Sequence, residues 1–318
     1  MTTIRLIGAP TDIGASVRGA GLGPDALRVA GLPEALQLRG LQVTDQGNLP
    51  GPTNPWQPPH TGYRHLPEVV AWNQSIYNAV ETALAHQQLP VLLGGDHCLA
   101  IGSISAVARH CRTAGRPLRV LWFDAHADAN TAHITPSGNV HGMPAACLLG
   151  HGPEALTQLG GAVALQPHQL HQIGVRSVDA EERAFVATLG YEVFDMRYID
   201  EFGMRATMER ALADLPPDAH LHVSFDMDCM DPEIAPGVGT AVRGGPTYRE
   251  IQLCMEMIAD TGLLGSVDLV ELNPALDVRN QTALLAVDLI ESLFGKNTLV
   301  RRHTPRLAHF PGNGPTGR

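Results

Sequence analysis

The sequence predicts an α/β fold in which parallel strands alternate with crossover helices. Short apolar runs rich in β-branched residues recur along the whole chain, and helix-length segments separate them. Most of these runs are continuous rather than alternating, which is typical of strands buried on both faces of a sheet. The pattern indicates either an open doubly wound sheet or a closed barrel, and alternation alone does not distinguish these two folds.

The predicted elements follow one another in a regular order from the first apolar run. The strands are expected at residues 4–7, 41–44, 90–93, 119–123, 171–175, 191–194, 220–225 and 266–272. The helices are expected at residues 24–38, 68–87, 101–114, 143–149, 181–189, 204–215, 248–261 and 280–294. Because no Ser/Gly linker or charge block divides the chain, we expect one domain over residues 1–300.

Two segments fit neither kind of element. Residues 48–67 are rich in proline and are expected to form a surface loop. The tail, residues 301–318, carries four arginines among Gly and Pro, and we expect either a flexible tail or an intersubunit arm.

Composition restricts the partners and the compartment. The chain has 318 residues, of which 44% are hydrophobic, and its net charge is -10. This charge argues against nucleic acid or an anionic membrane as the main partner and mildly favours small cationic ligands, although solubility alone explains it equally well. Five scattered cysteines without a C-x-x-C pair indicate reduced thiols. Neither a signal segment nor an apolar stretch of about 20 residues is present, so we expect a cytoplasmic protein.

The strongest functional signal is the segment Asp-Ala-His-Ala-Asp at 124–128, which directly follows the apolar run 120–123. In an extended chain, Asp124, His126 and Asp128 point to the same side. They are expected at the carboxyl end of a parallel strand, where α/β proteins place their sites. Three polar residues of an exposed loop are the alternative for this fragment alone.

Two further fragments repeat this arrangement. Asp226 and Asp228 follow another buried run, and two carboxylates there would repel each other unless a cation neutralised them. His97 follows Gly94 and Gly95, which permit a sharp turn at the end of the run 90–93. The sequence therefore places six ligand-type side chains at the ends of three strands.

The six side chains favour a pair of manganese ions. Four carboxylates and no thiolate are unsuited to one tetrahedral zinc, whereas an oxygen-rich, near-octahedral site suits Mn²⁺. Two such ions, about 3.5–4 Å apart, can share a water and deprotonate it to a hydroxide nucleophile at neutral pH.

With these motifs the chain resembles the arginase branch of the ureohydrolases, from residue 4 to about residue 299. Its Gly-Gly-Asp-His at 94–97, Asp-Ala-His-Ala-Asp at 124–128 and Ser-Phe-Asp-Met-Asp-Cys-Met-Asp-Pro at 224–232 match the three metal motifs of that family. The resemblance implies a single-domain three-layer fold with an open, eight-stranded parallel sheet flanked by helices, and a homotrimer or homohexamer. It also implies that His97 and Asp128 bind one Mn²⁺, that His126 and Asp228 bind the other, and that Asp124 and Asp226 bridge both.

Two further segments resemble the parts of the family's enzymes that bind L-arginine. Segment 130–142 is similar to the substrate loop of the family, which implies that four residues hold the α-carboxylate and α-amino group: Asn130, Thr135, Ser137 and Asn139. Segment 176–182 resembles the stretch that binds the α-ammonium and gives this role to Asp179 and Glu182. Taken without the resemblance, Asn130, Ser137 and Asn139 are ordinary turn residues.

Two more residues complete the expected catalytic set. Glu271 lies within the apolar run 269–272, where an unpaired carboxylate is rarely buried, and the resemblance pairs it with the substrate guanidinium. His141 would act as a proton shuttle, because histidine exchanges protons near neutral pH; a structural role is the alternative for a lone histidine. The expected reaction is attack of a bridging hydroxide on the guanidinium carbon, which splits L-arginine into L-ornithine and urea. Asp128 is expected to accept the proton of this nucleophile.

Three alternatives remain at this point. A ureohydrolase could act on another guanidino or formimino substrate, such as agmatine, guanidinobutyrate or formiminoglutamate, and a homologue could bind ligand without turnover. A dinucleotide-binding enzyme is suggested by Gly21-Leu22-Gly23, but that fingerprint should follow its strand immediately. Cys98 and Cys229 depart from the family pattern beside the metal motifs and predict sensitivity to thiol reagents if they lie close to the metals.

Overall fold

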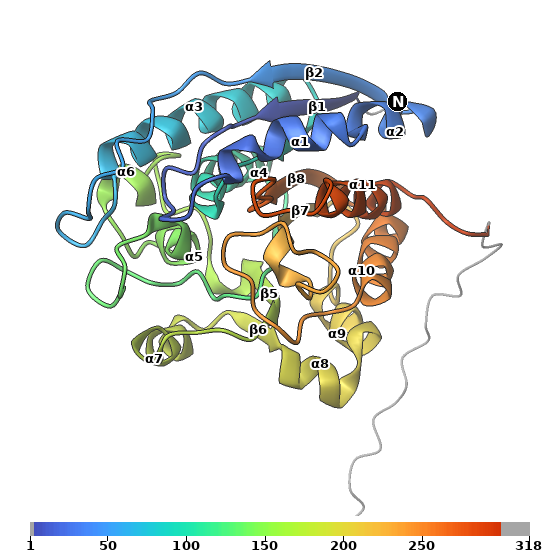
Figure 1. Cartoon of the computed structure of the whole chain (residues 1–318). Helices are drawn as coiled ribbons and strands as arrows, with labels where there is room; N and C mark the ends of the chain where they lie inside the picture. The colour runs from blue at the N-terminus through green and yellow to red at the C-terminus, as the bar shows by residue number, and fades with distance from the viewer. Residues whose placement is uncertain (1–2, 300–318) are drawn as a thin grey trace, which may run out of the picture.

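The computed structural model describes residues 3–299 and contains one sheet of eight parallel strands (Figure 1). The strands lie in the order β2-β1-β3-β8-β7-β4-β5-β6. In chain order they are β1 (Thr3–Gly8), β2 (Gln42–Asn48), β3 (Gln88–Leu93), β4 (Leu118–Phe123), β5 (Leu170–Val175), β6 (Glu192–Asp195), β7 (His220–Asp226) and β8 (Leu264–Val270). Because β2 and β6 are the two edges, the sheet is open and the barrel is excluded. The predicted fold class is confirmed.

The burial of the strands explains why the apolar runs in the sequence are continuous. Every residue of β5 and β7 is buried, whereas edge strand β2 has no fully buried residue. Inner strands are covered on both faces and therefore need apolar side chains at every position, while an edge strand does not.

Helices cover both faces and make three layers. One core cluster joins one face of the sheet to α3 (Leu66–Ala85), α4 (Ala100–Ala114), α5 (Pro144–Leu148), α6 (Glu154–Thr157) and α7 (Ala180–Leu189). The other cluster joins the opposite face to α1 (Gly23–Val29), α2 (Leu32–Leu38), α8 (Met196–Phe202), α9 (Met204–Ala211), α10 (Tyr248–Thr261) and α11 (Gln281–Leu293). Short 3-10 turns complete the chain at η1 (Ala20–Leu22), η2 (His97–Leu99), η3 (Val140–Gly142), η4 (Pro167–Gln169) and η5 (Met227–Cys229).

Three helical segments differ from the sequence-based expectation, and one of them is the short helix α6, which no expected element covers. The single helix expected at 24–38 is interrupted, because Gly31 adopts a left-handed φ of 85° between α1 and α2. Helix α8 was not expected; it begins where the Asp195 carboxylate accepts a hydrogen bond from the Tyr198 amide (2.8 Å) and ends at Gly203. The expected loop at 48–67 is irregular, apart from the last residue of β2, an isolated bridge between His60 and Tyr63, and the start of α3.

Four neighbouring strands position the site. β3, β8, β7 and β4 are adjacent at the centre of the sheet, and all run in the same direction. The segments after them, 94–97, 271–273, 226–228 and 124–128, therefore meet at one edge of the sheet. In residues 3–299 the structure has no helix long and apolar enough to cross a membrane.

Candidate active site

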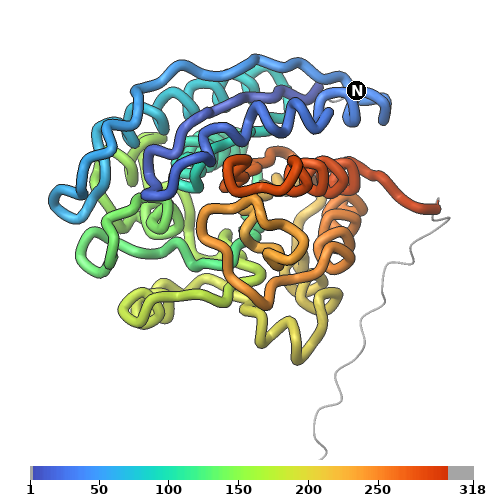
Figure 2. The backbone as a smooth tube through the Cα atoms, in the orientation of Figure 1, coloured from blue at the N-terminus to red at the C-terminus, as the bar shows by residue number. Residues whose placement is uncertain are grey.

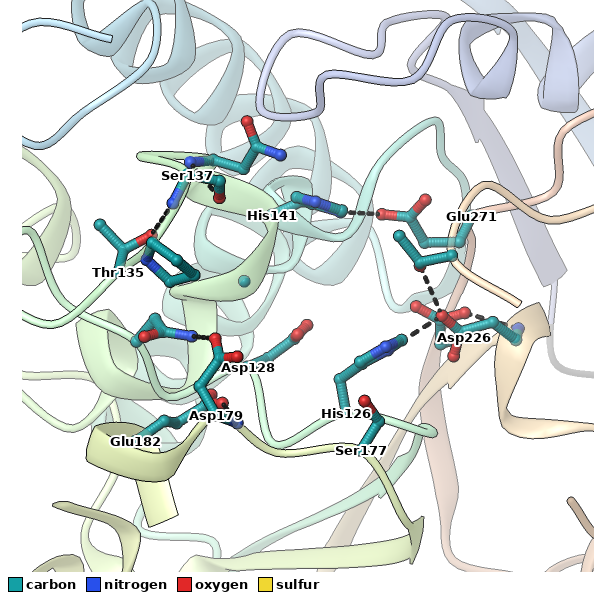
Figure 3. Close-up of a pocket in the computed structure, with 16 residues that line it drawn as sticks. His126, Asp128, Thr135, Ser137, His141, Ser177, Asp179, Glu182, Asp226 and Glu271 are labelled. Carbon is teal, nitrogen blue, oxygen red and sulfur yellow. Dashed lines mark hydrogen bonds and ion pairs between the residues drawn. The ribbon is translucent and has the colours of Figure 1, made fainter. Parts of the chain in front are cut away.

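A pocket opens at the carboxyl ends of β4, β5, β7 and β8 (Figure 3). Its walls combine carboxylates, histidines and small polar side chains: His126, Asp128, Asn130, Thr135, Pro136, Ser137, Asn139, His141, Gly142, Ser177, Asp179, Glu182, Asp226, Asp228, Thr240 and Glu271. All but two of the residues predicted for the site line this pocket, and those two, His97 and Asp124, lie fully buried beneath it.

The floor of the pocket is a cluster around His97. The His97 Nδ1 atom lies 3.1 Å from Asp124 Oδ2, 3.2 Å from Asp128 Oδ2 and 3.1 Å from Asp226 Oδ2. The other ring nitrogen, Nε2, lies 2.9 Å from Ser224 Oγ, and the ring stacks on Trp122 with centroids 4.2 Å apart. These contacts fix the ring orientation and leave Nδ1 to face the carboxylates.

A second cluster shares Asp124 with the first. His126 Nδ1 lies 3.5 Å from Asp124 Oδ1 and 3.1 Å from Asp228 Oδ2. Asp124 is held by Trp122, whose indole N–H donates to Oδ2 at 2.9 Å, and the Thr240 hydroxyl donates to Asp228 Oδ2 at 2.9 Å. Asp124 can thus offer one oxygen to each cluster, which is the geometry of a bridging ligand.

The electrostatics of the floor fit a cation. Burial, followed by the neighbouring Asp124 carboxylate, raises the pKa of Asp128 to about 8. Burial and then Asp228 raise the pKa of Asp226 well above its ordinary value. Burial alone would lower the pKa of His97, but the three carboxylates around it raise that pKa instead. One imidazole N–H cannot satisfy three carboxylate oxygens at once, so the donor set suits a metal ion better than a proton.

Two site residues adopt a left-handed backbone. Asp128 has φ 50° and Glu271 has φ 61°, a region that residues other than glycine rarely occupy. Such strain persists only where the surrounding structure enforces it, and it is concentrated at functional sites. At Glu271 the amide N–H donates to Gly95 O at 2.7 Å, which ties the end of β8 to the turn after β3.

Glu271 and His141 are in direct contact on one wall. The Glu271 Oε1 atom lies 2.9 Å from His141 Nδ1 (Figure 3). The same oxygen accepts the His97 backbone N–H at 2.8 Å. Burial would lower the pKa of His141, but Glu271 raises it to about 9. Burial likewise opposes ionisation of Glu271, yet His141 holds the pKa of this carboxyl below its ordinary value. The two form a partly buried ion pair.

Two hydroxyl groups lie at the mouth of the pocket. Thr135 Oγ1 accepts the backbone N–H groups of Ser137 and Gly138 at 3.3 and 3.0 Å, and Ser137 Oγ accepts that of Asn139 at 3.2 Å. Because both oxygens act as acceptors for the backbone, their hydroxyl hydrogens remain to donate to an anion.

The predicted substrate contacts Asn130 and Glu182 differ in whether their side-chain oxygens are free to bind a substrate. Asn130 Nδ2 donates to Asp179 Oδ2 at 3.3 Å, while its buried Oδ1 has no hydrogen-bond partner in residues 3–299. Such a buried acceptor needs a donor from elsewhere. Glu182 is less available, since its two oxygens accept the backbone N–H groups of Ala129 and Asp179 at 2.9 and 3.2 Å. Asp179 and Glu182 also form the capping box of α7.

The two cysteines beside the metal motifs are fully buried. Burial raises the pKa of Cys98 and of Cys229 well above the ordinary thiol value. A protonated thiol without solvent access reacts slowly with modifying reagents. The structure therefore does not favour the thiol sensitivity expected for a reactive cysteine.

Some supporting residues were not predicted from the sequence. Trp122 lies in the apolar run before Asp124, and Ser224 is the first residue of the motif 224–232. Their period-two spacing from Asp124 and Asp226 was an available signal. Thr240 belongs to an irregular loop, and nothing in the sequence marks it.

Comparison with known proteins supplies the family context. A family model described as "Arginase family" matches residues 2–295. A curated arginase of Bacillus caldovelox is 42% identical over 303 residues, covering 94% of this chain and 100% of the relative. An arginase of Brucella melitensis is 44% identical over 301 residues, covering 93% and 97%. The solved structure of the Bacillus caldovelox arginase superposes with a TM-score of 0.89 at 41% identity, covering 94% of this chain and 100% of that one.

Proposed function

The chain belongs to the arginase family, and from this premise we propose that it hydrolyses the guanidino group of L-arginine to L-ornithine and urea. One observation carries the proposal: three features meet at a single pocket. Two histidine–carboxylate clusters share Asp124, the buried carboxylate of Glu271 lies on one wall, and the hydroxyl groups of Thr135 and Ser137 lie at the mouth. The acidic part suits a guanidinium, and the hydroxyl part suits a carboxylate.

We infer that the clusters hold two Mn²⁺ ions. His97 and Asp128 would bind one ion, His126 and Asp228 the other, with Asp124 and Asp226 bridging. The proximity of Asp124 to both histidines and the oxygen-rich donor set support this assignment. When bound, such a pair lowers the pKa of water so that a hydroxide nucleophile forms at neutral pH.

The residues of the chain then have distinct roles. Glu271 binds the guanidinium through Oε2, since Oε1 already accepts the His97 amide and contacts His141. Asp128 would accept the proton of the nucleophile, because its carboxylate lines the pocket beside both histidine–carboxylate clusters, with Oδ2 3.2 Å from His97 Nδ1. His141 is held as an imidazolium by Glu271 and donates its proton to the departing amine of ornithine.

At the other end of the substrate, we propose that Thr135 and Ser137 donate their hydroxyl hydrogens to the α-carboxylate. The unpartnered Asn130 Oδ1 and the carboxylate of Asp179 then face the α-ammonium. Asn139 and Glu182 support this arrangement from the same wall, although their polar atoms already have partners within the chain.

We also propose that residues 1–300 form one catalytic domain, that the protein is cytoplasmic, and that it assembles as a homotrimer or homohexamer. Five buried free cysteines support a reducing compartment. Sedimentation analysis tests the assembly. The predicted tail, 301–318, lies outside the described residues.

The decisive experiment is product analysis after incubation with Mn²⁺. Purified protein should release urea from L-arginine much faster than from agmatine or guanidinobutyrate, and should release no formamide from formiminoglutamate. Faster turnover of one of these other compounds would identify that compound, rather than arginine, as the substrate. Full activity with one tightly bound zinc per chain would refute the manganese pair.

A further inference from the structure

The segment between β2 and α3, residues 49–65, packs directly against the proposed substrate loop, residues 130–142. Figure 2 shows this segment as the outer turn beside the green substrate loop. The Arg64 backbone N–H donates to Gly138 O at 2.7 Å. A Cβ atom on Gly62 would lie 2.4 Å from Ala132 O, and one on Gly138 would lie 2.5 Å from Pro59 Cβ. The two loops approach so closely that only glycine fits at both positions.

The Arg64 side chain reaches further into this contact. Its Nε donates to Asn139 Oδ1 at 2.7 Å, and its Nη1 donates to Gln57 O at 2.9 Å. Asn139 Nδ2 in turn donates to Ser16 Oγ at 3.0 Å. Both polar atoms of the Asn139 amide are therefore engaged within the chain, and Arg64 holds this residue in place on the pocket wall.

The charge of Arg64 is not neutralised by a carboxylate. Over residues 3–299, no Asp or Glu lies within ion-pair distance of its guanidinium. The pocket itself is lined by six carboxylates and by neither lysine nor arginine. Two of these carboxylates, Asp179 and Glu182, are not assigned to the metals and lie at the amino-acid end of the pocket. A substrate carboxylate that binds there meets like charge, so a cation just behind the loop lowers the cost of binding it.

Building on the proposed function, we propose that Arg64 is a specificity-determining positioning residue that favours substrates with an α-carboxylate. It acts through Asn139 and Gly138 by fixing the loop that presents the Ser137 and Thr135 hydroxyl groups. It also supplies the nearby positive charge that an α-amino acid needs and a decarboxylated guanidine does not. This assigns residues 49–65 a role in substrate selection.

The test compares Arg64→Gln, Arg64→Lys and a control, Arg205→Gln, which removes one charge from an exposed arginine on α9. Steady-state kinetics with Mn²⁺-loaded enzyme gives KM and kcat for L-arginine and agmatine. Arg64→Gln should raise the KM for arginine on the order of 10-fold, as for loss of a charge-assisted contact, with little change in kcat. Agmatine kinetics should stay unchanged, Arg64→Lys should recover part of the loss, and the control should match wild type.

Calorimetry supplies a readout that is independent of turnover. Ornithine, which keeps the α-carboxylate, should bind Arg64→Gln more weakly, whereas putrescine, which lacks it, should bind as to wild type. Equal losses for arginine and agmatine, or an unchanged preference, would overturn the proposal. If Arg64→Gln does not fold, Arg64→Lys decides: a higher KM for arginine with unchanged agmatine kinetics supports the positioning role of the Arg64 hydrogen bonds, and equal effects on both substrates overturn the proposal. Absence of arginine hydrolysis in the wild type would instead reject the proposed function.

Discussion

Replacing Glu271 by glutamine removes one negative charge from the pocket and preserves the shape of the side chain. Glu271 is only 3% exposed, and its Oε1 accepts the His97 amide at 2.8 Å. A glutamine oxygen can still accept that amide, so the turn after β3 should keep its conformation. Because Glu271 belongs to neither histidine–carboxylate cluster, the variant should also retain its metals.

The expected loss of activity follows from the burial of this carboxylate. Hydrogen bonds to charged groups contribute about 1.5–3 kcal/mol each, and a buried charge that loses its partner costs about 3–5 kcal/mol. A guanidinium facing a neutral amide in place of Glu271 should therefore lose about 3–5 kcal/mol of transition-state stabilisation. This corresponds to a decrease of about 10²- to 10⁴-fold in kcat/KM for arginine.

The assay is urea release, combined with elemental analysis for manganese. Asp268→Asn is a matched control, since Asp268 is a buried carboxylate on β8 that contacts Ser103 and His222 rather than the pocket. This control should lose stability but keep its turnover per folded molecule. A Glu271→Gln enzyme with a kcat/KM within a few fold of wild type would refute the assignment of the guanidinium to Glu271, and loss of manganese would make Glu271 a metal-site residue.

Three further predictions address the remaining roles. Asp128→Ala should bind less manganese and lose nearly all activity, because it removes both a ligand and the proton acceptor; elemental analysis with normal metal content and normal turnover would contradict this. His141→Asn should keep both metals and slow turnover on the order of 10-fold or more, as for loss of a proton shuttle; loss of manganese with unchanged arginine affinity would instead identify a ligand. Burial lowers the pKa of His220 to about 3, so the folded protein keeps this ring neutral while the unfolded chain binds a proton below about pH 6.5. Wild type should therefore lose stability as the pH falls below 6.5, and His220→Gln should lose about 2 kcal/mol less between pH 7 and pH 5 in denaturant unfolding; equal losses would show that His220 is not the titrating group.

Much of the fold could be predicted because burial on both faces imposes continuous apolar runs on inner strands. The same rule predicted less about the edges: β2 extends to Asn48 through polar residues that no apolar run marks. Helix α8 was missed because its start depends on a single cap, Asp195, and its aromatic side chains do not form a long apolar stripe. The division of the expected first helix depends on the left-handed φ of Gly31, which a helical pattern does not reveal.

The positions of the proposed metal ligands could be predicted because parallel strands end at the same edge of a sheet. The backbone conformations of Asp128 and Glu271 could not, since their positive φ values depend on contacts from distant segments, such as Glu271 N–H to Gly95 O. The environment of Asn139 was equally hidden, because its partners Arg64 and Ser16 lie 75 and 123 residues away along the chain.

The two ends of the proposed substrate are bound by different parts of the fold, the guanidinium by residues at strand ends and the amino-acid end by residues on loops. The residues assigned to the metals and to the guanidinium follow central strands, whose positions the sheet fixes. The residues assigned to the amino-acid end lie mainly on the loop 130–142, which ends in 3-10 turn η3 and is held in place by the 49–65 segment. Substitutions in these loops can therefore change the preferred guanidine while the hydrolytic centre stays intact. For this reason, the ratio of kcat/KM for arginine to kcat/KM for agmatine tests the loop assignments more sharply than total activity does. Any damage to the strand ends would lower total activity.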